Sequence, residues 1–344
     1  MNVLKPKQTF IFVKIKTMNF RTIVELPKYD FKITHNQSCV FIGSCFTENI
    51  GDKIAKSKIN ISINPTGIHY NPFSIADTIK TIINTKLLSS EDLFLANDIW
   101  NNYNFHSRFS STSQDKTLKT INEAIKQANI ALKNADYLFV TFGTAYAYVL
   151  SQTRQIVSNC HKQNAEVFDR IFLSPTEIVE EWKELIEVLH QFNPKLKIVF
   201  TVSPIRHWKD GATNNQMSKA ALFLAIKTLL ESSKKNSIYY FPAYEIVMDE
   251  LRDYRFYADD MLHPSSSAIE YIWEKFQESF FERGTLELNK RIEKIVVASQ
   301  HRPFNLDTEE YRSFCKKMLE EIEYFKKTYP SLNFNCEEIA FANS

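Results

Sequence analysis

Short apolar runs alternate with longer amphipathic stretches along most of this chain. The runs consist mainly of β-branched and aromatic residues, and most of them stop at a glycine, a proline or a serine. Runs of this kind are typical of strands that are buried on both faces. They predict strands at 38–43, 59–63, 137–142, 197–202 and 238–241.

The stretches between these runs carry apolar residues at the spacing of an amphipathic helix. In the clearest case, which begins at Pro175, one stripe consists of Ile178, Val179, Trp182, Leu185, Ile186 and Leu189. The same pattern predicts helices at 47–57, 72–85, 117–134, 176–192, 215–233 and 268–280. Because strands alternate with helices, we expect an α/β fold of three layers, α/β/α, with a mostly parallel sheet.

Three regions depart from this alternation. Residues 88–116 are polar and aromatic without a clear period, which predicts an inserted loop, and residues 145–156 resemble a hairpin-like excursion. After residue 285 the chain becomes strongly charged, with apolar residues at helical spacing in 286–300 and 308–328, as in an appended helical segment.

These patterns divide the chain into three parts. Residues 1–18 are interpreted as an N-terminal extension, because Met18 begins a segment that reads as a natural start. Residues 19–284 are expected to form the main domain, and residues 285–344 the C-terminal helical segment. The apolar run at 10–13 is too short for a signal peptide, and no run is long enough to span a membrane.

Composition narrows the class of protein. With 344 residues, of which 44% are hydrophobic, the chain can bury a large core. The 42 Lys and Arg residues nearly balance the 40 Asp and Glu residues, which argues against a nucleic-acid partner. The cysteines are odd in number and have no C-x-x-C spacing, so neither a disulfide framework nor a zinc site is indicated. We therefore expect a cytoplasmic protein without a membrane partner.

Glycine and polar residues follow the ends of four of the predicted strands. Ser44 and Cys45 follow Gly43 at the start of a helix, where the helix dipole favours an anionic nucleophile or a developing oxyanion. Gly67, Gly143 and the stretch 203–207 follow three other strands. In parallel sheets ligands bind outside the carboxyl ends of the strands, so these groups are expected to converge on one rim.

A second stretch offers acid–base chemistry. Asp260 precedes His263 by one turn, so its carboxylate can orient the imidazole and stabilise its charged form. The same spacing also occurs where an aspartate only caps a turn. No H-x-H or H-x-x-x-H spacing supports a metal site, and no metal or cofactor is expected.

These residues carry a family resemblance. The strings at 43–46, 64–67 and 203–207, together with Asp260-x-x-His263 before a proline and a helix, resemble the GSCFA family, a branch of the SGNH (GDSL-like) hydrolase superfamily. The match runs from about residue 19 to residue 284. The resemblance implies metal-independent hydrolysis of an ester, often an acyl group on a sugar or a lipid.

The resemblance also implies roles for individual residues. Gly67 corresponds to a glycine whose N–H forms part of the oxyanion hole, Asp260 to the orienting acid and His263 to the general base. SGNH enzymes have Gly-x-Asn-Asp after the third strand, where this chain has Gly143 but no such asparagine. We assign Gly143 to the oxyanion site with Gly67, although loss of one oxyanion donor typically slows a reaction by about 100- to 1000-fold.

The sequence leaves alternatives for the identity of the nucleophile and for the function. Alignment with the superfamily's first block favours Cys45, whereas Ser44 is the literal hydroxyl of the motif, and a buried cysteine at such a turn often only packs. A cysteine here has two influences that favour a thiolate, the helix dipole and a nearby imidazolium.

We expect a hydrolase or acyltransferase acting on an O-acyl ester, and the aromatic residues of 99–109 favour a saccharide ester. The rival is a catalytically silent glycan- or ligand-binding protein. Residues in loops that are candidates for substrate contact, or else for local hydrogen bonds at the surface, are His106, Arg108, His161, Arg206 and His207.

Overall fold

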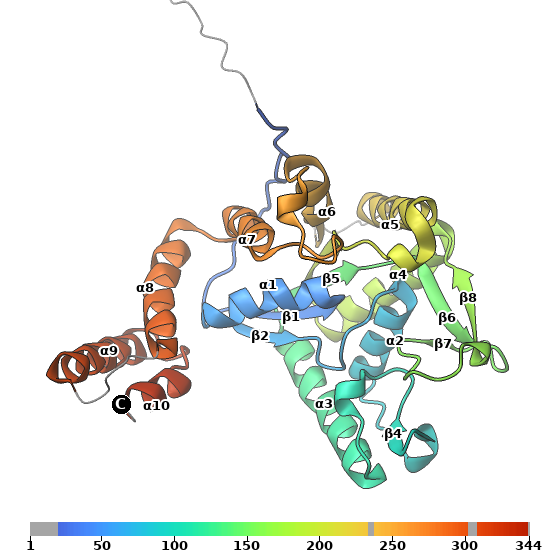
Figure 1. Ribbon diagram of the computed structural model, residues 1–344, viewed down its shortest axis with the longest axis horizontal. Coiled ribbons are helices and arrows are strands. Elements are labelled where there is room, and N and C mark those ends of the chain that lie inside the picture. Colours follow the sequence, from blue (N-terminus) through green and yellow to red (C-terminus); the bar gives the residue numbers. More distant parts are fainter. Residues whose placement is uncertain (1–19, 233–236, 302–307, 343–344) are drawn as a thin grey trace, which may run out of the picture.

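The computed structural model describes residues 20–232, 237–301 and 308–342, and its centre is a parallel sheet (Figure 1). The sheet order is β10-β9-β5-β1-β2, and every neighbouring pair is parallel. The strands are β1 (Ser38–Gly43), β2 (Asn60–Ile63), β5 (Tyr137–Phe142), β9 (Lys197–Val202) and β10 (Ile238–Tyr240). The strand order reverses between β1 and β5, the position at which such sheets bind ligands.

Helices cover both faces of this sheet, as predicted. Alternate strand residues point to opposite sides, so Val40 and Ile42 pack into one core while Cys39 and Phe41 pack into the other. The first core includes α2 (Pro72–Ile83), α3 (Gln114–Asn134), α4 (Pro175–Phe192) and α5 (Gly211–Ser232). The second includes α1 (Cys45–Lys56) and α7 (Ser266–Phe280). The three-layer α/β/α fold is therefore confirmed.

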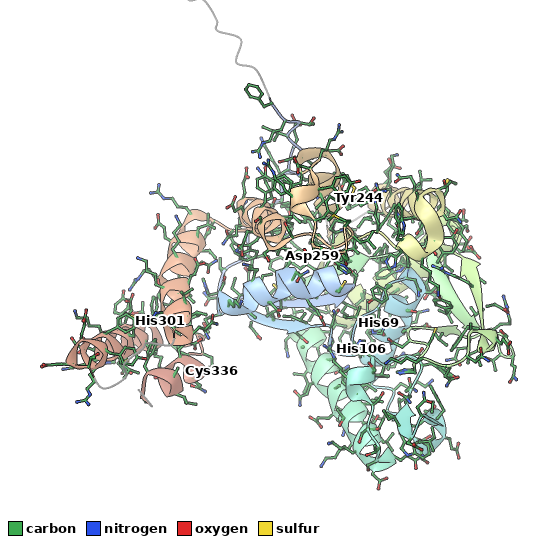
Figure 2. All side chains as sticks on the ribbon, viewed as in Figure 1. His69, His106, Tyr244, Asp259, His301 and Cys336 are labelled. Atoms are coloured by element: carbon green, nitrogen blue, oxygen red, sulfur yellow. The ribbon has the colours of Figure 1, made fainter. Side chains whose placement is uncertain are left out.

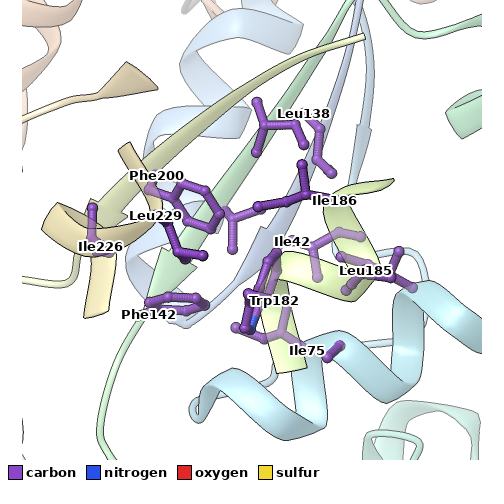
Figure 3. Packing of buried hydrophobic residues seen from close by; sticks show 14 of the residues in the cluster. Ile42, Ile75, Leu138, Phe142, Trp182, Leu185, Ile186, Phe200, Ile226 and Leu229 are labelled. Carbon is purple, nitrogen blue, oxygen red and sulfur yellow. The ribbon is translucent and has the colours of Figure 1, made fainter. Parts of the chain in front are cut away.

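Trp182 lies at the centre of the larger core (Figure 3). Its indole is fully buried, with its ring centroid 5.1 Å from that of Phe142 and 5.2 Å from that of Phe200. The indole N–H donates to the carbonyl of Pro72 at 3.1 Å. The aromatic contacts hold α4 to the sheet, and the hydrogen bond ties it to the start of α2.

The structure corrects several predicted boundaries. Helix α1 begins at Cys45, earlier than predicted, because Ser44 has the extended backbone of an N-cap. The predicted loop 88–116 contains a hairpin of β3 (Phe94–Ala96) and β4 (Ile99–Asn101), and α3 begins inside it at Gln114. These strands are short, and Asn97 and Asp98 between them both have positive φ, as a type I′ turn requires.

A second, antiparallel sheet flanks the carboxyl end of the main one. The hairpin predicted at 145–156 exists as β6 (Tyr146–Leu150) and β7 (Ile156–Val157). A third strand that the sequence pattern did not indicate, β8 (Phe168–Phe172), pairs along β6. The short α6 (Ala243–Glu245) and a π-helical turn at Ile246–Glu250 follow β10.

The C-terminal helices form a separate cluster at the opposite end of the molecule from β6, β7 and β8 (Figure 1). They are α8 (Arg283–Gln300), α9 (Glu309–Thr328) and α10 (Asn335–Ala342), and the last was not predicted. Ile292, Ile322 and Phe325 are among their buried residues. Across the described parts of the chain, no helix has the length and apolar character needed to cross a membrane. The predicted N-terminal extension, residues 1–18, lies outside the described residues.

Candidate active site

Strand β1 ends at a position that only glycine can occupy. Gly43 has φ +153°, and a Cβ there would come within 2.4 Å of the Thr141 carbonyl oxygen on β5. The N–H of Gly43 donates to the buried side chain of Asn64 at 2.9 Å. The strand therefore turns in close contact with β5 and delivers Ser44 and Cys45 to the start of α1.

The 64–67 motif supports this turn. Asn64 is fully buried and has φ 42°, a left-handed conformation that asparagine tolerates better than most residues. Its own N–H donates to the carbonyl of Phe41 at 2.8 Å, and its own carbonyl accepts the N–H of Gly67 at 2.8 Å. The motif is thus a hydrogen-bonded clamp on the end of β1.

A chain of side chains joins the thiol to a carboxylate. The Cys45 Sγ lies 3.9 Å from His263 Nε2, and His263 Nδ1 lies 2.5 Å from Asp260 Oδ2. The other carboxylate oxygen accepts the N–H groups of Leu262 and His263, each at 2.9 Å. This turn therefore fixes Asp260, which in turn orients the imidazole toward the thiol.

Ser44 is placed differently from Cys45. It is 1% exposed, and within the described part of the chain its hydroxyl has no hydrogen-bond partner. Its side chain makes no capping hydrogen bond to α1 either. The structure therefore gives the imidazole contact to the thiol of Cys45 and not to this hydroxyl.

The pKa shifts describe the resting state of the site. Burial raises the pKa of Cys45, an effect that the N–H groups of Phe46 and of Cys45 itself oppose. The resting cysteine is therefore a thiol, contrary to the influences that favoured a thiolate. The N–H groups of His263 and Leu262, followed by the imidazole, lower the pKa of Asp260 to about 2, so this carboxylate is ionised at neutral pH.

These residues open onto a cavity of about 490 Å³ at the carboxyl ends of β1, β5 and β9. Its lining is rich in aromatic and basic side chains: Tyr70, Tyr146, Tyr148, Trp208, Arg170, Arg206, His207 and Lys209. Ser44, Cys45 and His263 also line it, as do Ser203, Arg206 and His207 from the predicted stretch, whereas Gly67 and Gly143 are not among its lining residues. A hollow of about 910 Å³ between α8 and α9 contains none of these residues.

Both N–H groups predicted for the oxyanion hole have other acceptors. The N–H of Gly67 bonds the Asn64 carbonyl, as described above, and the N–H of Gly143 donates to the carbonyl of Tyr70 at 2.8 Å. Sequence reasoning places a glycine near a site but does not show which carbonyl its N–H will meet. The N–H groups of Cys45 and Phe46 lie against the thiol.

Only two of the five predicted substrate contacts line the cavity. Arg206 and His207 do so, and burial, reinforced by the charges of Lys219, Arg170 and His263, lowers the pKa of His207 to about 4. The imidazole of His207 is therefore neutral at physiological pH.

His106, Arg108 and His161 do not line the cavity and make local contacts instead. His106 accepts the N–H of Arg108, Arg108 pairs with Glu48, and His161 bonds the Asn102 carbonyl at 2.8 Å. These three residues therefore make the local contacts of the alternative interpretation, and their contact with a substrate stays a prediction.

Two buried groups near the site had little sequence signal. His69 lies beside His106 in Figure 2, and its ring meets the hydroxyls of Thr66, Thr78 and Ser158 at 2.9, 3.1 and 3.0 Å. Burial lowers the pKa of His69 to about 3, so the ring is a neutral structural link. Its position directly after Gly67 and Ile68 was the only hint.

Lys219 is the other buried group. It is fully buried on α5 and donates to the carbonyls of Gly143 at 2.6 Å and Ser203 at 2.7 Å. It therefore joins the carboxyl ends of β5 and β9. A lysine within a helical pattern gives no sign of such a role.

The described residues contain no group of three or more His, Cys, Asp or Glu side chains that is arranged to hold a metal ion. The site consists instead of a thiol, an imidazole and a carboxylate at the switch point of a parallel α/β sheet. Two family models match this chain. The GSCFA family matches residues 38–276, and the GSCFA C-terminal domain matches residues 292–343. The chain belongs to the GSCFA family, as its motifs indicated.

Solved structures give more distant likenesses. An acetyl xylan esterase from Butyrivibrio proteoclasticus is 11% identical with a TM-score of 0.36, over 73% of this chain and 65% of that one, so this chain spans less than two thirds of its length. A family 3 carbohydrate esterase from Talaromyces cellulolyticus is 10% identical with a TM-score of 0.34, over 74% and 99% of the two chains.

A family two carbohydrate esterase from Clostridium thermocellum is 11% identical with a TM-score of 0.30, over 78% and 67%. The search of curated proteins found no match. At these identities and TM-scores the likenesses carry no argument about chemistry.

Proposed function

We propose that this protein is an ester hydrolase or acyltransferase in which Cys45 is the nucleophile, His263 the general base and Asp260 the orienting acid. The observation that carries the proposal is the continuous chain of contacts from the Cys45 thiol through the imidazole to the Asp260 carboxylate. A nucleophile beside a base that a third group orients is the signature of covalent catalysis.

The first half of the reaction forms a thioester. His263 Nε2 takes the proton from the Cys45 thiol as Sγ attacks the ester carbonyl carbon. The 3.9 Å separation is long, as is common before a substrate is bound. The tetrahedral oxyanion lies at the start of α1, where the N–H groups of Cys45 and Phe46 and the helix dipole favour negative charge. When the C–O bond breaks, the imidazolium returns its proton to the leaving oxygen.

The second half releases the acyl group. Water, or a second alcohol in an acyltransferase, loses a proton to His263 and attacks the thioester carbonyl, and the C–S bond then breaks as the imidazolium protonates Sγ. Because burial raises the pKa of the thiol, the base must act during attack, which makes the orientation of His263 essential.

The test compares three single variants on aryl acetates and acetylated sugars. Cys45→Ala should abolish turnover, whereas Ser44→Ala should retain it. Cys160→Ala is the matched control, because Cys160 is a second free thiol in the lining of the same cavity. A thiol-directed alkylator should modify Cys45 and stop turnover. Full activity in Cys45→Ala, together with loss in Ser44→Ala, would transfer the role to Ser44.

The rival function is a ligand-binding protein without catalysis. It is favoured by the engaged N–H groups of Gly67 and Gly143 and by the absence of an asparagine after Gly143. If acetylated sugars bind without turnover, and His263→Ala leaves that binding unchanged, the rival replaces the enzyme.

A further inference from the structure

The cavity beside Cys45 has an unbalanced charge. Three of its lining side chains, Arg170, Arg206 and Lys209, are cationic, and no Asp or Glu is among the described residues that line it. A concave site of one sign raises the local concentration of ligands of the opposite sign.

Two of the three cations are already engaged. Arg170 forms an ion pair with Asp210, and its guanidinium lies 4.7 Å from the ring centroid of Tyr146. The ammonium of Lys209 donates to the Tyr148 hydroxyl at 2.6 Å. Both side chains therefore brace the antiparallel sheet that forms one wall of the cavity.

Arg206 lacks an ionic partner of this kind. Among the contacts of the described residues, its guanidinium has one hydrogen bond, from Nη2 to the Met248 thioether at 3.7 Å, and it forms no ion pair. A thioether is a weak acceptor, whereas a guanidinium carries five donors in a planar fork that matches a carboxylate or a phosphate. A half-buried cation with so little compensation is poised to bind an anion.

The position of Arg206 relates it to the chemistry. It follows β9 on the rim of the cavity that also holds His263, and Met248 belongs to the π-helical turn after α6. Burial raises the pKa values of Tyr244 and Tyr257, and the charge of Arg206 opposes both rises, which places its guanidinium near these hydroxyls. Tyr257 begins the segment that leads to Asp260 and His263.

We propose that the ester substrate carries an anionic group, a carboxylate or a phosphate, and that Arg206 binds this group while Cys45 attacks the ester. The inference rests on the proposed function and names its substrate class: O-acylated sugar acids or sugar phosphates, whose rings are bounded by Tyr146, Tyr148 and Trp208. Arg206 then acts as a specificity residue, because it discriminates between charged and neutral esters.

The first experiment measures kcat/KM at low ionic strength for acetylated methyl glucoside, acetylated glucuronate and acetylated glucose 6-phosphate. We expect one anionic ester to be preferred over the neutral one, and the carboxylate and phosphate arms show which group is recognised. Arg206→Met should lower the anionic-to-neutral ratio of kcat/KM by about 10- to 100-fold, the range for a lost hydrogen-bonded charge contact. Arg206→Lys should keep part of the ratio, and Arg252→Met, which removes an exposed arginine, should keep all of it.

The second experiment separates this inference from the proposed function. Glucuronate, glucose 6-phosphate and glucose are titrated calorimetrically into Cys45→Ala protein with and without Arg206→Met. Anion binding that requires Arg206, without turnover of any ester by the native protein, would uphold Arg206 as an anion-binding residue but would defeat the enzyme, and with it the assignment of this anion to an ester substrate. Turnover with equal kcat/KM for neutral and anionic esters, or a ratio that Arg206→Met leaves unchanged, would overturn the inference and leave the enzyme standing. Neither turnover nor binding would overturn both.

Discussion

The buried clamp on Gly43 predicts a measurable loss of stability when Asn64 is replaced. In Asn64→Ala, the buried N–H of Gly43 loses its 2.9 Å acceptor, which typically costs about 1–3 kcal/mol. Alanine must also adopt φ 42° without the polar side chain that lets asparagine tolerate this conformation, which adds up to about 1–2 kcal/mol. The expected total is about 2–5 kcal/mol.

The chain offers a matched control for the backbone contribution. Asn97 also has a positive φ, 52°, but it is exposed in the β3–β4 turn. Asn97→Ala should therefore cost only the conformational part, about 1–2 kcal/mol. The difference between the two alanine variants gives the contribution of the Asn64 side-chain contacts, which are the hydrogen bond from Gly43 at 2.9 Å and a longer one to Glu48 at 3.4 Å.

Urea unfolding followed by circular dichroism gives both free energies. Ester turnover should also fall in Asn64→Ala by more than its folded fraction explains, because Gly43 positions Cys45. If Asn64→Ala and Asn97→Ala lower the free energy of unfolding by the same amount, the Asn64 side chain contributes nothing to the clamp and the reasoning is refuted.

Three other variants test separate parts of the structure. Asp260→Asn should reduce kcat by about 10,000-fold with unchanged circular dichroism, as loss of an orienting carboxylate does in other triads. The control is Asp259→Asn, at a neighbouring exposed aspartate. A loss of activity in Asp259→Asn alone would disprove the pairing of Asp260 with His263. Burial lowers the pKa of Lys219 from 10.5 to about 7. Between pH 7 and pH 10.5 the unfolded chain therefore binds a proton that the folded chain lacks. The free energy of unfolding should then rise with pH by up to about 1.4 kcal/mol per pH unit. Lys219→Met should lack this rise in urea unfolding, and parallel curves for the two proteins would contradict the assignment. Trp182→Ala should cost about 3–5 kcal/mol because it opens a cavity in the main core, and Trp182→Phe should cost less; a thermal unfolding profile unchanged in Trp182→Ala would contradict this packing.

The parts of the fold that sequence predicted well are those with a strong local signal. The strands of the central sheet are buried on both faces, so each is a continuous apolar run such as 137–142. The β3–β4 hairpin has few residues and is partly exposed, so its pattern is indistinct. The start of α1 was predicted less well. Ser44 is the N-cap by its backbone conformation alone, since its side chain makes no capping hydrogen bond.

The candidate site divides in the same way. The pairing of Asp260 with His263 follows from a spacing of one turn, and the structure has it. The acceptors of the Gly67 and Gly143 N–H groups depend on Asn64 and Tyr70, and in the second case the donor and acceptor are far apart in the sequence. The role of Lys219 depends on two carbonyls from different strands, a long-range arrangement that no local pattern encodes.

The separate antiparallel sheet has a consequence for how this site can diversify. Strands β6, β7 and β8 pair only with one another within the described sheets, whereas Cys45 begins α1 just after β1 of the central sheet. The wall that contains Tyr146, Tyr148 and Arg170 is thus a separately hydrogen-bonded module beside the proposed reaction centre, joined to the main core through the packing of Ala147. Substitutions or length changes in this module can alter which molecules are admitted without disturbing the register of the central sheet. Selectivity and reactivity are therefore open to separate change, by evolution or by engineering.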